Sequence, residues 1–168
     1  VVDKPGLRPT PDRVRETLFN WLGQDLTGWR CVDAFAGTGA LGFEAASRGA
    51  SSVLMLEQDA QLVSLLGETQ KRLSASAVQV QKGDAMMALQ RLSPSTLDVI
   101  FLDPPFESTH FEKALQAAAQ AVAPEGWVYL EAPQAWQADA LAATGLNLVK
   151  YMKAGAVHAH LLQRPAEG

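Results

Sequence analysis

This 168-residue sequence lacks the features that mark several classes of protein. It has a single cysteine, Cys31, which excludes an internal disulfide framework and a cysteine-rich zinc site. It also lacks a long hydrophobic run, because its longest apolar stretches, such as residues 99–102, have only the length of a strand. No signal peptide is visible, so we expect a cytoplasmic protein that does not enter a membrane.

Positive charge is also scarce. The chain has 14 Lys and Arg residues against 18 Asp and Glu residues, and its net charge of −4 argues against a protein that holds naked nucleic acid by bulk electrostatics. The charge is uneven, since residues 1–30 carry five basic and four acidic side chains, whereas residues 31–168 carry nine and fourteen. A solvated helix face would explain so small a difference, but the N-terminal end is the relatively basic part of the chain.

What the sequence does contain is typical of an ordinary globular protein. It is 48% hydrophobic and 19% charged, with 13 Gly and 9 Pro, which excludes collagen-like, disordered and coiled-coil chains. The length suits one domain over residues 1–168, which we divide into a helical extension (1–28) and a core (29–168). In the extension, Thr10 and Pro11 are typical of an N-cap and a first helical position, and apolar residues follow at helical spacing.

Strands and helices alternate five times in the core, which is the pattern of a doubly wound, mostly parallel α/β sheet with helices on both faces. Nearly continuous apolar strands agree with this, because the strands of such sheets are covered on both sides. The last two strands have no helix between them, so we expect them to pair antiparallel at an edge of a seven-stranded sheet. We predict strands at residues 30–36, 52–57, 77–81, 97–103, 126–131, 146–152 and 156–163.

Ligands in such folds bind at the carboxyl ends of the strands, and the residues there indicate a cofactor site. Gly37 and Gly39 follow the first strand and let the backbone approach a ligand closely, and Gly42 lets the next helix pack against the strand. The spacing of these three glycines also fits a dinucleotide-binding fingerprint or an ordinary tight turn between a strand and a helix. Glu57 follows the second strand and could hold two ribose hydroxyls, or be a surface or helix-capping carboxylate. Asp84 follows the third strand and could accept from an adenine amino group or cap the next helix.

Two further features separate the possible cofactors. Asp33 precedes the first loop glycine by four residues, where a carboxylate would repel a pyrophosphate but attract a cationic amino-acid group. Asp103, Pro104, Pro105 and Phe106 follow the fourth strand. The two prolines remove two N–H donors, which leaves a carboxylate, free carbonyls and an aromatic plane. Such a site suits a planar group that bears an NH₂, although a rigid turn with Phe106 in the core is the structural alternative.

The order of these motifs resembles that of class I S-adenosylmethionine-dependent methyltransferases. The segment DAFAGTG (33–39) is followed by Glu57, Asp84 and DPPF (103–106), and the last element resembles that of enzymes that methylate exocyclic amino groups of bases or a glutamine amide. The run RPTPDRVRETLFNWL (8–22) is similar to the family of bacterial 16S ribosomal RNA guanine-N2 methyltransferases, the RsmD family. That family has a further N-terminal strand region with an Arg-Gly-Arg/Lys element, which this sequence lacks, so we expect a preceding segment to be missing.

The resemblance implies a Rossmann-like class I methyltransferase with S-adenosylmethionine as cofactor and 16S ribosomal RNA as substrate, within an assembled small ribosomal subunit. We expect a monomer without a metal ion. Asp103 and the Pro104 carbonyl would orient the guanine amino group, and Phe106 would stack on the base. The remaining implied roles are a methionine pocket at Asp33, Ala36, Gly37 and Gly39, where Thr10 would bind the cofactor carboxylate with Arg13 nearby, a ribose site at Glu57, an adenine site at Asp84 and Ala85, a backbone fixed by Pro105, and RNA contacts at Lys4, Arg8 and Arg15.

Other functions stay open at this point. The same cofactor could serve methylation of adenine N6 or of a glutamine amide. An NAD-dependent oxidoreductase could use the loop at 37–42, but no Tyr/Lys pair for hydride transfer is evident and DPPF would be unexplained. A noncatalytic RNA-binding module would leave the acidic residues without a role. Elsewhere, His158 and His160 share one face of the last predicted strand, but no further metal ligand is evident. We expect Cys31 to be buried and to fill space in the core rather than act as a nucleophile.

Overall fold

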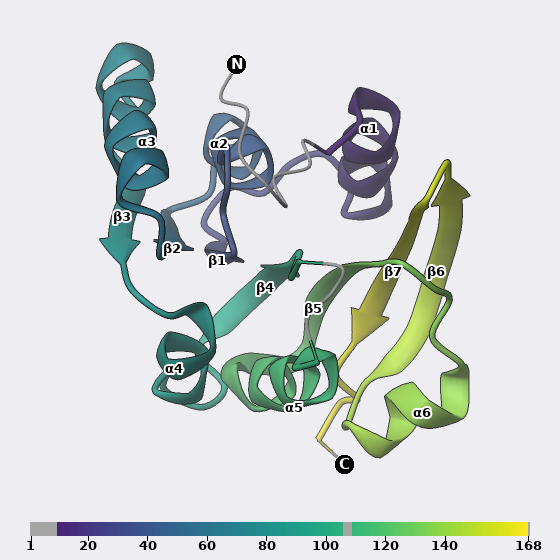
Figure 1. Cartoon of the computed structure of the whole chain (residues 1–168). Coiled ribbons are helices and arrows are strands. Elements are labelled where there is room, and N and C mark those ends of the chain that lie inside the picture. Colours follow the sequence, from purple (N-terminus) through teal and green to yellow (C-terminus); the bar gives the residue numbers. More distant parts are fainter. Residues whose placement is uncertain (1–9, 106–108, 168) are drawn as a thin grey trace.

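The computed structural model describes residues 10–105 and 109–167, and in that part of the chain seven strands form one sheet flanked by helices (Figure 1). The strands are β1 (Arg30–Ala34), β2 (Ser52–Glu57), β3 (Val78–Lys82), β4 (Leu97–Leu102), β5 (Val122–Ala132), β6 (Asn147–Ala154) and β7 (Val157–Gln163). The helices are α1 (Asp12–Trp21), α2 (Ala40–Ser47), α3 (Ala60–Leu73), α4 (Ala85–Gln90), α5 (Phe111–Ala121) and α6 (Ala138–Ala143).

The sheet has the strand order β3-β2-β1-β4-β5-β7-β6. Strands β1 to β5 pair in parallel, whereas β7 pairs antiparallel with both β5 and β6. This confirms the predicted α/β class with an antiparallel pair at the C-terminus. Because β1 to β5 are parallel, their carboxyl ends lie along one edge of the sheet, which we call the carboxyl edge, and ligands bind at that edge in such folds.

Hydrophobic side chains cover both faces of the sheet, which explains the nearly continuous apolar strands. Helices α1, α2 and α3 pack on one face through residues such as Leu18, Leu41 and Leu66. Helices α4, α5 and α6 pack on the other face through residues such as Leu89 and Leu141. Figure 1 shows these two layers above and below the sheet. Both layers hold the loops at the carboxyl edge on rigid elements.

Some local predictions were wrong. Thr10 is not the N-cap of α1, because Pro11 has the non-helical cap conformation and its carbonyl accepts from the Arg15 nitrogen, 3.0 Å away. The first strand ends at Ala34, two residues early, because Phe35 adopts a left-handed backbone with φ of 61°. The fifth strand begins earlier than predicted, at Val122. In the described residues, every helix is too short or too polar to cross a membrane.

Candidate active site

Asp33 stands near the end of β1 and has only 2% of its surface exposed. Its Oδ2 accepts from the backbone nitrogen of Gly42, 2.9 Å away in the first turn of α2. A Cβ at position 42 would lie 2.9 Å from that oxygen and 2.6 Å from the Met55 methyl group, so only glycine fits. Burial raises the pKa of Asp33 to about 8, opposed by the Gly42 N–H and helped by Glu131 and Glu57. The carboxyl is therefore largely protonated at neutral pH, and a cation beside it would favour its ionised form.

The glycine loop between β1 and α2 is held by its own hydrogen bonds. The Gly37 nitrogen donates to Glu57 Oε1 over 2.9 Å, and the Gly39 nitrogen donates to the Ala36 carbonyl over 2.8 Å. Gly39 has a φ of 80° and precedes α2, and a Cβ there would lie within 2.8 Å of side chains from α2 and α3. The second oxygen of Glu57 accepts from the Asp59 nitrogen at 2.9 Å. Glu57 therefore joins the loop after β1 to the start of α3.

Asp84 follows β3 and caps α4. Its side chain accepts from the Met87 nitrogen over 3.1 Å, which is the capping alternative foreseen from the sequence. Ala85, the first residue of α4, is buried. The cap fixes the position of the Asp84 carboxylate, and its contact with an adenine stays a prediction.

Asp103, Pro104 and Pro105 follow β4, directly beside β1 in the sheet. Asp103 is half-buried, Pro104 is buried and Pro105 is exposed. The Asp103 charge also helps to raise the pKa of the Tyr129 hydroxyl in β5, the strand that pairs with β4. Phe106 lies outside the described residues, as do the predicted RNA contacts Lys4 and Arg8.

Glu131, near the end of β5, is a site residue that sequence reasoning missed. Its carboxyl is 1% exposed and accepts from the Tyr129 hydroxyl at 2.9 Å and from the Thr10 hydroxyl at 3.1 Å. Burial, together with Glu131 and Asp103, raises the pKa of Tyr129 well above its ordinary value, so this hydroxyl remains a donor. The available signal was an acid at the end of a predicted strand, the same signal that had identified Glu57.

The Thr10–Glu131 hydrogen bond ties the segment before α1 to the carboxyl edge, across 121 residues of sequence. It explains why Thr10 does not cap the helix, since its hydroxyl hydrogen goes to Glu131 instead. In this arrangement the Thr10 oxygen can accept a hydrogen bond from a ligand but has no hydrogen left to donate to one. Arg13 lies nearby in sequence and is exposed on α1.

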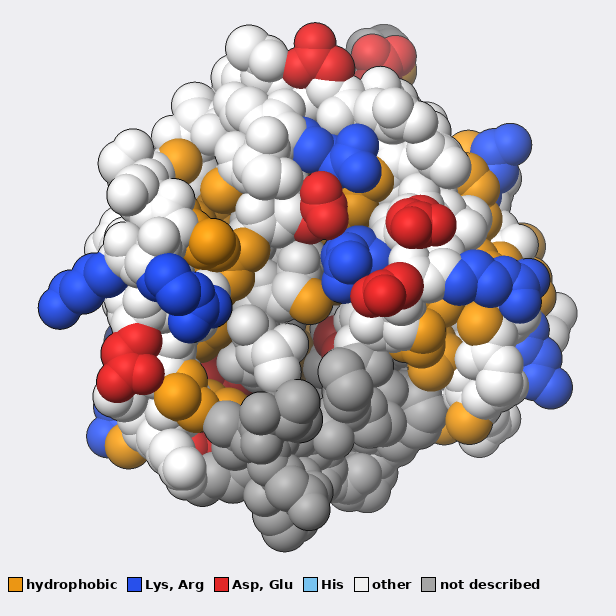
Figure 2. All heavy atoms as spheres, turned by 90° about the horizontal axis from the view of Figure 1, so that it is seen from above, with side chains coloured by type: hydrophobic (Ala, Val, Ile, Leu, Met, Phe, Trp, Pro, Cys, Tyr) orange, Lys and Arg blue, Asp and Glu red, His pale blue; other side chains and the backbone are white. Residues whose placement is uncertain are grey.

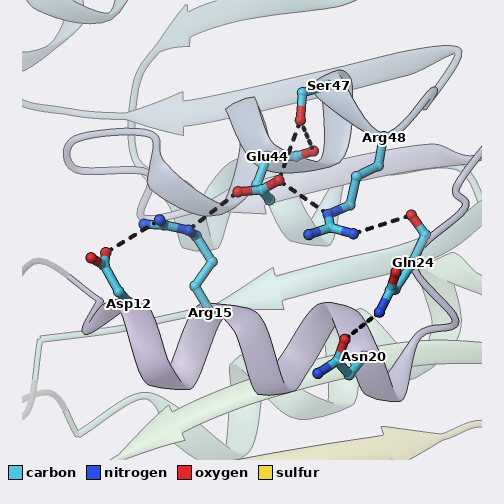
Figure 3. A network of polar contacts seen from close by, with 7 residues as sticks. All are labelled: Asp12, Arg15, Asn20, Gln24, Glu44, Ser47 and Arg48. Carbon is cyan, nitrogen blue, oxygen red and sulfur yellow. Dashed lines mark hydrogen bonds and ion pairs between the residues drawn. The ribbon is translucent and has the colours of Figure 1, made fainter.

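Arg15 belongs to a chain of polar contacts between α1 and α2 (Figure 3). Its guanidinium lies 3.2 Å from Asp12 and 3.3 Å from Glu44, and Glu44 also pairs with Arg48 at 3.0 Å. Arg48 in turn donates to the Gln24 carbonyl at 3.4 Å. Arg15 therefore holds α1 beside α2 in this structure, and its contact with RNA stays a prediction.

The two strand histidines have partners within the protein. His160 is buried, with Nε2 accepting from the Trp136 nitrogen over 3.0 Å and Nδ1 lying 3.2 Å from the Leu130 carbonyl. Burial lowers the pKa of His160, which keeps its ring neutral. His158 Nδ1 is hydrogen-bonded to the Tyr151 hydroxyl. Among the residues that the structure describes, no group of three or more His, Cys, Asp or Glu side chains could hold a metal ion.

Cys31 is buried in β1, as predicted, and makes a poor nucleophile. Burial, with smaller contributions from Asp98 and Asp33, raises the pKa of its thiol to about 12.

The polar groups described at the carboxyl edge are carboxyl groups, backbone carbonyls and one tyrosine hydroxyl. The structure brings Asp33, Glu57 and Asp103 to the ends of the adjacent strands β1, β2 and β4, with Asp84 beyond β3 at the side.

Comparison with known proteins gives a consistent result. Residues 1–163 match a family model described as Conserved hypothetical protein 95. The chain is 37% identical over 171 residues to the ribosomal RNA small subunit methyltransferase D of Escherichia coli K12, covering all of this chain and 85% of that protein. It is 43% identical over 120 residues to the protein of the same name from Haemophilus influenzae, covering 70% and 61% of the two chains. The solved structure of yhhF from Escherichia coli superposes with a TM-score of 0.81 at 32% identity, covering 95% and 89%.

Proposed function

We propose a function from one premise: this chain belongs to the RsmD family, whose model carries the description Conserved hypothetical protein 95. The chain is a methyltransferase that acts on ribosomal RNA. Its acceptor is the exocyclic N2 amino group of a guanine in 16S ribosomal RNA of the small subunit, and its cofactor is S-adenosylmethionine. The enzyme works in the cytoplasm, where that subunit is assembled.

The observation that carries the choice of cofactor is the use of the loop N–H groups. The nitrogens of Gly37, Gly39 and Gly42 donate to Glu57, to the Ala36 carbonyl and to Asp33. A dinucleotide needs such donors for its pyrophosphate. Here they are occupied, and one of the occupants, the acidic side chain of Glu57, would repel a phosphate. The residues therefore fit a cofactor with a cationic amino-acid end and disfavour NAD.

The residues that would hold S-adenosylmethionine lie at the ends of β1, β2 and β3. Asp33 would attract the cationic end of the methionine moiety, with the loop backbone around it. The Thr10 oxygen would accept from the ammonium group, and Arg13 would face the carboxylate. Glu57 would hold the ribose hydroxyls, and Asp84 and Ala85 would meet the adenine. When bound, the cofactor supplies an electrophilic methyl group on a sulfonium centre.

The residues at the end of β4 would orient the acceptor. The guanine amino lone pair is conjugated with the ring, so the free amino group is a poor nucleophile. The Asp103 carboxylate and the Pro104 carbonyl would accept its two N–H bonds, which makes the nitrogen more electron-rich and fixes its line of attack. The proton can leave after methyl transfer, so Asp103 does not need to be a strong base. Phe106 is the proposed stacking partner of the base.

The acceptor base has to leave its stack to reach this edge, or already be single-stranded. The net charge of −4 fits poorly with tight binding of free RNA. We therefore propose the assembled small subunit as the substrate, with Lys4, Arg8 and Arg15 on the contact side.

The test uses tritiated S-adenosylmethionine and small subunits from a strain that lacks the gene, with free 16S ribosomal RNA in parallel. Digestion to nucleosides should place the label in N2-methylguanosine from the subunits. Label in N6-methyladenosine, or in protein, would contradict the proposed acceptor. Absence of label, with S-adenosylhomocysteine still bound in a calorimetric titration, would contradict the RNA substrate and leave the cofactor assignment in place.

A further inference from the structure

A pocket of about 350 Å³ lies at the carboxyl edge, between the segment that follows β5 and the first turn of α5. Its lining includes the aromatic residues Phe111 and Trp136 and the polar residues Gln134 and Gln137. Its volume is at the lower end of the range for small-molecule sites, about 300–1,000 Å³. Both flanking segments leave the carboxyl ends of β4 and β5, so the pocket shares its edge of the sheet with Asp103.

The aromatic wall of this pocket is rigidly held. The Phe111 and Trp136 rings lie 6.3 Å apart between centroids, with their planes inclined at 37°. The Trp136 backbone is fixed by its hydrogen bond to His160 in β7. His160 in turn lies against Tyr151 of β6, with 5.2 Å between ring centroids. His160 therefore joins the pocket to the edge strand of the sheet.

The edge strand continues the aromatic surface and adds a positive charge. Tyr151 is 41% exposed, and its ring lies 5.9 Å from that of His158. The register pairs Tyr151 with His160 and Lys153 with His158, so these four side chains share one face of the sheet. Lys153 is exposed and forms no ion pair within the described residues. We call Phe111, Trp136, Tyr151, His158 and Lys153 the aromatic belt.

The free lysine of the belt contrasts with the cations over α1 and α2. Arg15 and Arg48 are neutralised by Asp12 and Glu44. Figure 2, which looks down on the α1–α3 layer, shows basic and acidic side chains intermixed near the centre of this face. Because no described acidic side chain pairs with Lys153, its charge attracts a partner with negative charge to the belt.

We propose that the aromatic belt binds single-stranded RNA beside the target guanine. One unpaired base enters the pocket and packs against the Trp136 ring, where Gln134 and Gln137 hydrogen-bond its edge. A neighbouring base stacks on Tyr151, and Lys153 neutralises a phosphate. Aromatic faces interleaved with a positive charge are the usual means of holding single strands, because every base has a face that stacks. This inference rests on the proposed function and takes the case in which the target guanine already lies within a single-stranded segment.

The experiment compares Tyr151→Ala with Tyr151→Phe, which keeps the stacking ring. Initial rates of methyl transfer are measured against the concentration of small subunits, with S-adenosylmethionine saturating. We expect Tyr151→Ala to raise KM for the subunit at least about fivefold, with kcat and the affinity for S-adenosylhomocysteine unchanged. Tyr151→Phe should keep the KM of the wild type. Trp136→Ala should raise KM in the same way, with its melting temperature recorded to confirm folding.

The matched controls are Leu73→Ala and Lys71→Ala in the last turn of α3. Leu73 is a large hydrophobic residue with 56% exposure, and Lys71 is an exposed cation. They lie at the opposite edge of the sheet, since α3 connects the end of β2 to the start of β3. Neither control should change KM.

Lys153→Ala tests the phosphate contact. It should make the slope of log K for single-stranded RNA against log salt concentration shallower by about 0.7, the value for one single-stranded phosphate contact.

A second readout separates this proposal from the proposed function. The same variants are titrated by fluorescence anisotropy with a labelled single-stranded RNA oligonucleotide and with its duplex, in the presence of S-adenosylhomocysteine. We expect the wild type to prefer the single strand, and Tyr151→Ala to lose that preference. If Tyr151→Ala keeps both the preference for single-stranded RNA and the KM of the wild type, the proposal that the aromatic belt binds single-stranded RNA is wrong. Failure of the wild type to methylate guanine N2, with the preference lost in Tyr151→Ala, would overturn the proposed function and leave the belt in place.

Discussion

The Asp33 carboxyl illustrates how much one buried side chain decides in this protein. It has almost no exposure to water, and its hydrogen bond from Gly42 opposes only part of the cost of burial. Without a bound cation the group retains its proton near neutral pH. A cationic ligand would stabilise the ionised form, so ligand binding and proton release are coupled at this residue.

Substitution of Asp33 by Asn should change how stability depends on pH. The pKa of Asp33 is raised from 3.8 to about 8 in the folded protein, so between these values the folded state binds a proton that the unfolded state has lost. The free energy of unfolding therefore falls as pH rises through this window and levels off above about 8. Asparagine does not titrate, so the variant should lack this contribution, whose slope approaches about 1.4 kcal/mol per pH unit.

The measurement is urea unfolding of both proteins at a series of pH values from 5 to 9. The stability of the wild type should decline relative to that of Asp33→Asn across the lower part of this range. Two parallel curves would show that Asp33 has an ordinary pKa in the folded protein.

Two glycines provide a second test at the residue scale. A Cβ at Gly42 would collide with Asp33 and Met55, whereas a Cβ at Gly67 in α3 meets no atom within 4 Å. Gly67→Ala should stabilise the protein by about 0.5–1 kcal/mol, because alanine loses less backbone freedom in a helix. Gly42→Ala should destabilise it by about 1–3 kcal/mol and weaken binding of S-adenosylhomocysteine. Urea midpoints and calorimetric titration measure both effects, and equal stabilities for the two variants would refute the close packing of α2 on β1.

At the scale of elements, α1 is held to the core by two kinds of contact. Its apolar face buries Val14, Leu18 and Phe19, and its polar face carries the Asp12–Arg15–Glu44 contacts of Figure 3. Partly exposed ion pairs contribute little in water, whereas burial of a leucine contributes much more. The helix is therefore docked chiefly by its apolar face, and the ion pairs set its orientation on α2.

Removal of each kind of contact should show this difference. Leu18→Ala should lower the free energy of unfolding by about 2–5 kcal/mol. Arg15→Ala should lower it by at most about 1 kcal/mol, and this loss should shrink in high salt because salt screens exposed pairs. Urea unfolding at low and high ionic strength measures both effects. A larger loss for Arg15→Ala than for Leu18→Ala would mean that the ion pairs hold α1 in place.

The elements also show what sequence patterns can and cannot predict. The second strand was predicted at its observed bounds, Ser52–Glu57, because its apolar run is flanked by polar residues. The first strand was predicted too long, since no pattern announces the left-handed backbone at Phe35. Thr10 was misassigned because its partner, Glu131, lies 121 residues away, and pairings at that distance leave no local signal. Asp33, which precedes the glycine loop, and Asp103, which follows a strand, were found because each lies within a recognisable motif.

At the scale of the whole molecule, the strand order divides the carboxyl edge into two parts. Strands β1, β2 and β3 bring the groups proposed to hold the cofactor, and β4 brings those proposed to orient the acceptor. The class of sheet follows from the alternation of strands and helices, but the insertion of β7 between β5 and β6 does not, because it depends on which edges pair in space. The adjacency of β1 and β4 places Asp33 and Asp103 on neighbouring strands.

The most direct test of this division is Asp103→Asn, with Asp98→Asn as its control at the opposite end of the same strand. Transfer of label to guanine N2 and affinity for S-adenosylhomocysteine are measured on the same preparations. We predict that Asp103→Asn keeps its affinity for S-adenosylhomocysteine within about twofold while its rate falls at least about 100-fold, and that Asp98→Asn retains both. A rate for Asp103→Asn equal to that of the wild type would contradict the account, because the acceptor would then be oriented without this carboxylate.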